Sequence, residues 1–206
     1  AGVNEKGESL FYKNVKDEAG NITGRETTTN HAQADYYITE ESSIPKVYGG
    51  FGTKLKVYGV DFGINFTYQI GGKQYDGTYA YFMSSPYGTA GYNYHKDLLN
   101  SWTPENTNTN IPRFQMNDQY SGAMSTRFLT NASFLNIQNI NVGYTLPSKW
   151  TRKLVINSLR VYMSAENVFY WSKRKGFDPR QSYDETTNAT FYSPMRTISG
   201  GVSFEF

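Results

Sequence analysis

The 206-residue sequence contains no cysteine, which excludes a disulfide framework, a thiol enzyme and a cysteine-ligated metal site. It also carries little net charge, because 20 basic residues stand against 18 acidic ones and neither kind is clustered. A nucleic-acid binder that tracks phosphate groups is therefore excluded. No run of apolar residues approaches the roughly 18 that a transmembrane helix needs, so a helical span is excluded as well.

Aromatic residues, in contrast, are abundant. The 18 Tyr, 13 Phe and 3 Trp residues supply much of the apolar surface, although hydrophobic residues make up only 38% of the chain. A polar mean hydropathy combined with many aromatic side chains is typical of the one membrane architecture that hydropathy analysis does not detect. This is the β-barrel, whose strands are apolar only at alternate positions.

Alternation of apolar and polar residues predicts several strands with one apolar face each. It is complete in 61–71, recurs in 159–171 and 197–206, and is less regular in 50–58 and 140–146. Upstream of Ile140 the apolar residues change parity to Leu135 and Ile137, which predicts a β-bulge near Gln138 and Asn139. In the first 47 residues a small hairpin is expected, with strand-like pieces at 10–12 and 36–38 and a turn at 18–21.

The connections between the predicted strands alternate in length. Those at 58–61 and 147–156 are short, whereas those at 72–133 and 172–191 are long and polar. Long connections are unusual in a compact soluble domain, and outer-membrane barrels combine short periplasmic turns with long extracellular loops. Alternation alone leaves a soluble barrel open, because such a barrel has the same period with its apolar face inward.

Several strings resemble those of the SusC-like (RagA-like) TonB-dependent outer-membrane transporters. SWTPENTNTNIPR at 101–113 is similar to the family's WTPENPN…PR, and SFLNIQNINVGYTLP at 133–147 is similar to SFLRLKNITLGYTLP. LRVY at 159–162, ENVF at 166–169 and GFDP at 176–179 follow in the family's order. AGVN at 1–4 and IPKVYGGF at 44–51 extend the resemblance over nearly the whole chain. One departure is Asn136, where the family commonly has Arg.

The resemblance implies an all-β fold: an antiparallel transmembrane β-barrel segment with long extracellular loops. It corresponds to about five or six C-terminal strands of a barrel of about 22. Residues 1–47 are then an extracellular loop and hairpin region, 48–71 a strand hairpin, 72–133 a long extracellular loop and 134–206 the last three strands. Nothing in the sequence resembles the family's plug.

The function that the resemblance implies is import across the bacterial outer membrane. The substrate would be an oligosaccharide or a peptide, a SusD-like surface lipoprotein would close the loops, and TonB would act through the absent plug. The expected partners are therefore this lipoprotein, TonB, outer-membrane lipid and the substrate. The alternative is a soluble or surface-attached β-sheet carbohydrate-binding module, which would bury Phe62, Phe66 and Phe204 between sheets.

The sequence offers few residues in patterns that support catalysis. The two histidines, His31 and His95, lie in polar loop-like sequence without a nucleophile or zinc motif. The spacing of Asp76, Asp178 and Asp184 fits no calcium loop. We therefore expect no enzyme, no metal and no cofactor.

Functional residues are expected in three groups: substrate-binding, lumen-facing and membrane-interface residues. Rings in the long loop offer flat faces to sugars, although they also suit packing of the loop against itself; they are Tyr79, Tyr81, Tyr87, Tyr92, Tyr94 and Trp102. Polar-parity residues of 159–171 would face a wet lumen, and these are Arg160, Glu166 and Tyr170. Aromatic residues near the strand ends fit the two membrane interfaces, namely Phe169, Trp171, Phe204 and Phe206.

Overall fold

The computed structural model describes residues 1–84, 93–151, 156–180, 186–187 and 192–206. The chain forms two compact units. The first, here called the loop unit, comprises Ala1–Glu40 and Asp76–Leu129. The second, here called the sheet unit, comprises Glu41–Tyr75 and Thr130–Phe206.

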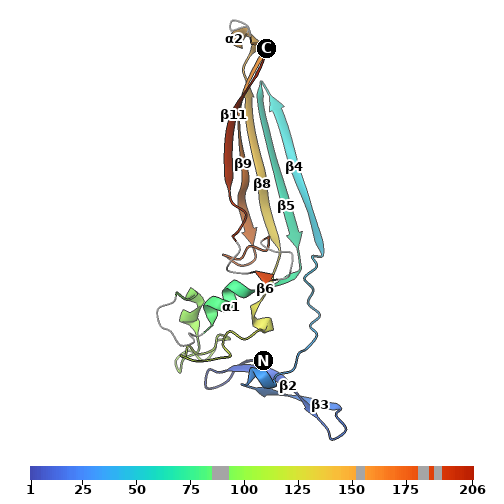
Figure 1. The fold of residues 1–206 in the computed structure, drawn as a ribbon, viewed down its shortest axis with the longest axis vertical. Helices are drawn as coiled ribbons and strands as arrows, with labels where there is room; N and C mark the ends of the chain where they lie inside the picture. Colours follow the sequence, from blue (N-terminus) through green and yellow to red (C-terminus); the bar gives the residue numbers. More distant parts are fainter. Residues whose placement is uncertain (85–92, 152–155, 181–185, 188–191) are drawn as a thin grey trace. The chain divides into compact units, whose positions relative to one another are not determined.

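The sheet unit is built on five long antiparallel strands in the order β11-β9-β8-β5-β4. The strands are β4 (Val47–Val57), β5 (Val60–Ile70), β8 (Phe134–Thr145), β9 (Ser158–Ser172) and β11 (Thr197–Glu205). They lie side by side in Figure 1, where α2 (Ser148–Thr151) and the end of the chain mark one end of the sheet. We call this end the turn end and the opposite one the loop end. The predicted all-β, antiparallel fold is confirmed.

A two-residue turn joins β4 to β5 at the turn end. Val57 pairs with Val60, so Tyr58 and Gly59 alone make the connection, with φ of 49° and 85°. Positive φ at both positions is the hairpin turn whose twist matches that of the strands. Glycine adopts it without strain, whereas Tyr58 is held in the left-handed region by the pairing on either side.

The sheet has one apolar and one polar face, because the registers align residues of like kind across the strands. One row of partners is Leu55, Phe62, Val142 and Met163, and another is Phe51, Phe66, Ile137 and Phe169. The residues between them form polar rows, such as Asn65, Asn139 and Glu166. Many apolar-face side chains are exposed; they include Leu55, Val142, Met163, Phe169, Trp171 and Phe204.

The predicted β-bulge is present. Asn65 pairs with Asn139, but the next residue, Phe66, pairs with Ile137, so Gln138 is the extra residue. On β9 the register skips Asn167 and Val168, and Asn167 has φ of 50°. The extra residue in β8 moves Ile137 and Leu135 onto the apolar face, which is what the change of parity in the sequence required.

The loop unit contains a small sheet with the order β1-β2-β3. Its strands are β1 (Gly2–Val3), β2 (Ser9–Lys16) and β3 (Ile22–Thr28). The hairpin was predicted at the right turn, but its second strand is 22–28 rather than 36–38, which is not strand. The prediction was wrong because β3 is exposed at nearly every position and therefore lacks the alternation that identifies a half-buried strand.

Short elements complete the chain. Around the loop unit they are η1 (His31–Gln33), α1 (Gly77–Met83), η2 (Lys96–Asn100) and η3 (Thr126–Phe128). A further small sheet has the order β10-β6-β7, formed by Thr186–Thr187, Lys73–Asp76 and Leu129–Asn131. In the part of the chain that the structure describes, no helix is long and apolar enough to span a membrane.

Candidate functional site

The polar face of the five-stranded sheet carries an ion pair that bridges two strands over a third. Arg160 on β9 donates from Nε to Asp61 Oδ1 at 3.0 Å and from Nη2 to Asp61 Oδ2 at 2.6 Å. Asp61 lies on β5, and β8 runs between the two. Gly143 of β8 is the partner of Asp61 in the register, and a Cβ built on it would lie 2.5 Å from Arg160 Nη2. The missing side chain at Gly143 therefore lets the two charged groups meet.

This geometry gives a prediction for Gly143→Ala. The added methyl occupies the space of the ion pair, so a double-mutant cycle between Asp61 and Arg160 should show coupling in the wild type and none in the variant. Gly63→Ala is the matched control, because a Cβ there meets nothing closer than 3.7 Å on the same sheet. The coupling is measured by thermal unfolding of the four proteins of the cycle, which are the parent, the two single variants and the double variant at Asp61 and Arg160. The cycle is repeated in the wild-type, Gly143→Ala and Gly63→Ala backgrounds. Coupling that survives in Gly143→Ala would contradict the argument.

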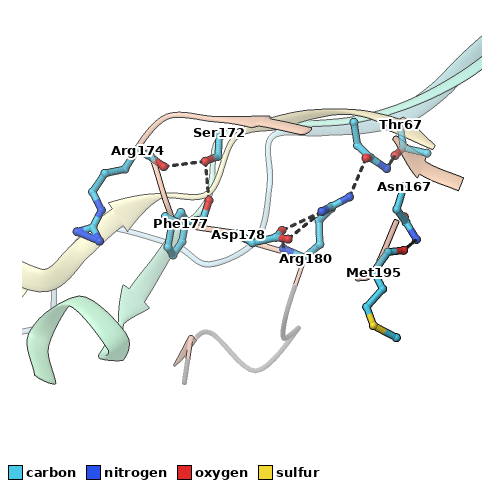
Figure 2. A network of polar contacts seen from close by, with 9 residues as sticks. Thr67, Asn167, Ser172, Arg174, Phe177, Asp178, Arg180 and Met195 are labelled. Atoms are coloured by element: carbon cyan, nitrogen blue, oxygen red, sulfur yellow. Dashed lines mark hydrogen bonds and ion pairs between the residues drawn. The ribbon is translucent and has the colours of Figure 1, made fainter. Parts of the chain in front are cut away.

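A second polar cluster lies at the loop end of the same face, in the segment that follows β9 (Figure 2). Arg180 donates to both carboxylate oxygens of Asp178, each at 2.8 Å, and to Asn136 Oδ1 at 2.7 Å. Asn136 in turn donates to Thr67 Oγ1 at 3.2 Å. The guanidinium also lies over the Tyr170 ring, 4.4 Å from its centroid. We call Asp178, Arg180, Asn136 and Thr67 the rim network.

Two members of the rim network are buried, and its electrostatics follow from this. Asp178 is 2% exposed and Asn136 is 4% exposed. Burial raises the pKa of Asp178, but the hydrogen bonds and charge of Arg180 outweigh it and hold that pKa below its usual range. Asp178 therefore stays ionised, and the segment 173–180 is fastened across β8 and β5.

In the loop unit, two segments that are distant in sequence form one body. Arg113 donates from its backbone to Gly7 O at 2.8 Å and from Nη1 to Lys6 O at 3.0 Å. Arg127 donates to Ser9 Oγ and Gly2 O, each at 3.2 Å. Burial lowers the pKa of Arg127 although Asp118 opposes the shift, and the guanidinium remains charged. Arginine side chains thus fasten the first forty residues to the 76–129 segment.

The predicted substrate-contact rings have different environments. Tyr79 donates from its hydroxyl to Asp97 Oδ2 at 2.9 Å and lies against His95, while Tyr94 lies against Phe114. Trp102 packs on Gly7, where a Cβ would come within 2.6 Å of the indole. Tyr81 is 60% exposed. Tyr87 and Tyr92 lie outside the described residues. The structure does not bring the four described rings together in one cluster, and three of them pack within the loop unit.

The predicted lumen and interface residues fall on the two faces of the sheet. Arg160, Glu166 and Tyr170 share the polar face through their partners Thr145, Asn139 and Asn136. Phe169 and Trp171 belong to the apolar face at the loop end, and both are more than half exposed. Phe204 lies on the same face at the turn end, and Phe206 follows β11 and is exposed. Their roles at a lumen or an interface remain predictions.

Sequence reasoning missed three residues that organise these clusters. Asp61 and Gly143 were seen only as polar-parity positions, and Arg180 was not singled out. The signal for Arg180 was its place directly after the GFDP string. Among the described residues no group of three or more His, Cys, Asp or Glu is placed to hold a metal ion.

The five-stranded sheet presents two chemically different faces. It offers a long amphipathic wall, one face apolar and exposed, the other polar and hydrogen-bonded, with a fastened segment at one end. This is a surface suited to separating an apolar phase from a polar one.

Comparison with known proteins gives consistent matches, although no protein-family model matches the chain. TonB-dependent receptor P3 of Formosa agariphila is 25% identical over 167 residues, 76% of this chain and 16% of that protein. TonB-dependent receptor SusC of Bacteroides thetaiotaomicron is 37% identical over 84 residues, 40% of this chain and 8% of that protein. The chain thus spans about a sixth of the length of the first curated relatives that it matches.

Solved structures match over the entire chain. The RagAB peptide importer in its closed-closed state superposes with a TM-score of 0.76 and 30% identity, covering 100% of this chain and 22% of that one. The structure of the RagAB peptide transporter gives a TM-score of 0.75 and 27% identity, also over 100% of this chain. These matched proteins are named as receptors and transporters rather than enzymes.

Proposed function

Because this chain is a segment of a SusC-like TonB-dependent transporter, we propose that it supplies barrel wall and substrate-facing extracellular loops to an outer-membrane importer. The segment is part of a transporter rather than of an enzyme. The proposed cargo is a nutrient oligosaccharide or peptide. The proposed partners are a SusD-like lipoprotein that closes over the loops and TonB, which acts through a plug outside this segment.

The observation that carries the proposal is the amphipathic sheet. A soluble sheet protein would cover the apolar face with a second layer, because a large exposed apolar surface favours association. In the sheet unit the apolar face includes Val142 at 43% and Met163 at 54% exposed, in the middle of the sheet. Lipid acyl chains are the covering that this surface fits, and the polar face then lines the interior.

The two free edges agree with the same interpretation. β4 and β11 are the outer strands of the five-stranded sheet and present unpaired backbone groups. Such groups are costly in hydrocarbon, at several kcal/mol each, unless further strands pair with them. The segment therefore works within a larger barrel.

For the loops, we propose that Tyr81 is a substrate contact and that Tyr79, Tyr94 and Trp102 shape the loop unit from within. The exposed ring of Tyr81 is free to meet the C–H face of a sugar or a peptide side chain. The rim network is proposed to keep the loop end of the wall in place when the loops open and close.

This segment has no cysteine of its own, so each single cysteine introduced into it can be labelled selectively in membranes, in a complete transporter whose other cysteines, if it has any, are replaced. Leu55→Cys and Val142→Cys on the apolar face should react several-fold more slowly with a water-soluble maleimide than Lys54→Cys and Asn141→Cys on the polar face. The pairs are sequence neighbours, so depth is matched and only the face differs.

Each of the four single-cysteine variants is also labelled after denaturation, where every cysteine is accessible. This total labelling corrects for differences in expression between the variants. Equal labelling of both faces, or fast labelling of the apolar face, would contradict the transporter wall. Protection of the apolar face without any membrane would instead favour the soluble carbohydrate-binding module.

A further inference from the structure

A pocket of about 720 Å³ lies along the loop end of β9, wholly within the sheet unit. Its lining includes Phe169, Trp171, Lys173, Lys175 and Arg196. The pairing of β9 with β11 ends at Glu166 and Thr197, so this stretch of β9 is not covered by β11. The pocket therefore follows an open strand edge where the sheet ends.

Apolar aromatic residues and then cationic residues line the pocket in order along β9 and the turn that follows it. Phe169 and Trp171 belong to the apolar face and are 59% and 54% exposed. Lys173 follows at the next position of the same parity, directly beyond the last strand residue, and is exposed. An apolar surface thus passes into a cationic one within a few residues.

The cations lack protein partners among the described residues. Lys173, Lys175 and Arg196 are all exposed, and the described lining of the pocket contains no carboxylate. The fourth cation of the lining, Arg180, is already paired with Asp178. As far as the described residues go, three positive charges are therefore available to an anion at this end of the sheet.

The turn that carries the lysines is held in place. The Ser172 hydroxyl lies within hydrogen-bonding distance of the carbonyl oxygens of Arg174 and Phe177 (Figure 2). In addition, Phe177 N donates to Arg174 O at 3.2 Å. Phe177 is 2% exposed, and Gly176 takes the left-handed conformation with φ of 85°. The backbone of Lys173 and Lys175 is therefore ordered before any ligand arrives.

We infer that this pocket binds one phosphorylated lipid from the outer leaflet. The phosphate headgroup lies among Lys173, Lys175 and Arg196, and an acyl chain lies against Phe169 and Trp171. Long cationic side chains at the border of an apolar surface place their charge at headgroup depth, where anionic lipid attracts them. The inference rests on the proposed function, because it needs the apolar face in a membrane.

The test uses the complete transporter in phosphatidylcholine nanodiscs with a minor fraction of phosphatidic acid, whose headgroup is a phosphate monoester. The transporter is released from the nanodiscs, and native mass spectrometry then counts the lipids that it retains. The wild type should retain phosphatidic acid in preference to phosphatidylcholine. The affinity of K173Q/K175Q/R196Q for phosphatidic acid should be lower than that of the wild type by roughly tenfold at least.

The matched control K54Q/K56Q/K149Q also removes three charges from the sheet unit, but away from the pocket, and it should bind as the wild type does. Equal retention by all three proteins would overturn the inference. Displacement of phosphatidic acid by millimolar inorganic phosphate would overturn it in favour of a site for free phosphate. Failure of the wild type to insert into pure phosphatidylcholine discs would instead count against the proposed function itself.

Discussion

Arg180→Gln is expected to release the segment 173–180 from the wall, with a local cost of about 3–5 kcal/mol. The Asp178 side chain is 1% exposed and the Arg180 side chain 11%, so the variant leaves a carboxylate buried without its counter-charge. It also removes the guanidinium donor to Asn136. Trypsin cleavage at Lys173, Arg174 and Lys175 should become roughly a hundredfold faster in the folded transporter.

The matched control is Asp178→Asn combined with Arg180→Gln. The double variant removes both charges and keeps amide groups, so it should be cleaved more slowly than Arg180→Gln alone. A buried pair of neutral groups costs less than one uncompensated charge. If the double variant is cleaved at least as fast as the single one, the burial of Asp178 is not the cause.

The pH dependence has a definite sign. In the wild type the pKa of Asp178 lies below its ordinary value of 3.8, so the pair stabilises fully above that pH and weakens only as pH falls through the lowered pKa. In Arg180→Gln burial is opposed only by the hydrogen bonds from the backbone of residue 180 and from Ser193, so the pKa of Asp178 rises relative to the wild type. The defect is therefore largest at neutral pH and shrinks on acidification. Cleavage at a series of pH values with an acid-tolerant protease separates the two profiles.

The sequence predicted the sheet well because its strands are half-exposed and keep period 2. The parity change between Ile137 and Ile140 even located the bulge, since only an extra residue keeps both on the apolar face. The strand β3 was missed for the opposite reason. Its residues, from Ile22 to Thr28, are almost all exposed, so their sequence does not alternate between apolar and polar residues.

The polar clusters could not be predicted from spacing. Asp61 and Arg160 are 99 residues apart, and they meet only because the intervening strand has Gly143 at the crossing point. Asn136 departs from the family strings and received no role, yet it is buried and accepts from Arg180 across 44 residues. Such contacts depend on strand order and register, which local patterns leave open.

Nor could the union of the two loops be predicted. The sequence divides 1–47 and 72–133 into separate loops, whereas Arg113 and Arg127 join most of both into one body through backbone carbonyls. Backbone acceptors exist at every residue and therefore leave no trace in the sequence. For the same reason, composition alone could not distinguish rings that pack internally, such as Tyr79, from an exposed ring such as Tyr81.

Met163→Arg is expected to destabilise the assembled transporter by about 2–4 kcal/mol, because it places a charge on the apolar face near the middle of β9. Met163 is 54% exposed, so the larger side chain meets no steric barrier in the sheet itself. The cost arises from the surroundings alone. In a lipid environment the guanidinium loses its hydration, whereas in water the substitution would be close to neutral.

Ser164→Arg is the matched control, one residue along the same strand and on the polar face. Its partners are Asn141 and Ser199, so the new charge remains among polar groups and should change stability by less than about 1 kcal/mol. Unfolding by urea from lipid vesicles measures both variants against the wild type. The sign of the difference decides which face meets lipid: a larger loss for Ser164→Arg would place the lipid on the opposite face and reverse the orientation of the wall.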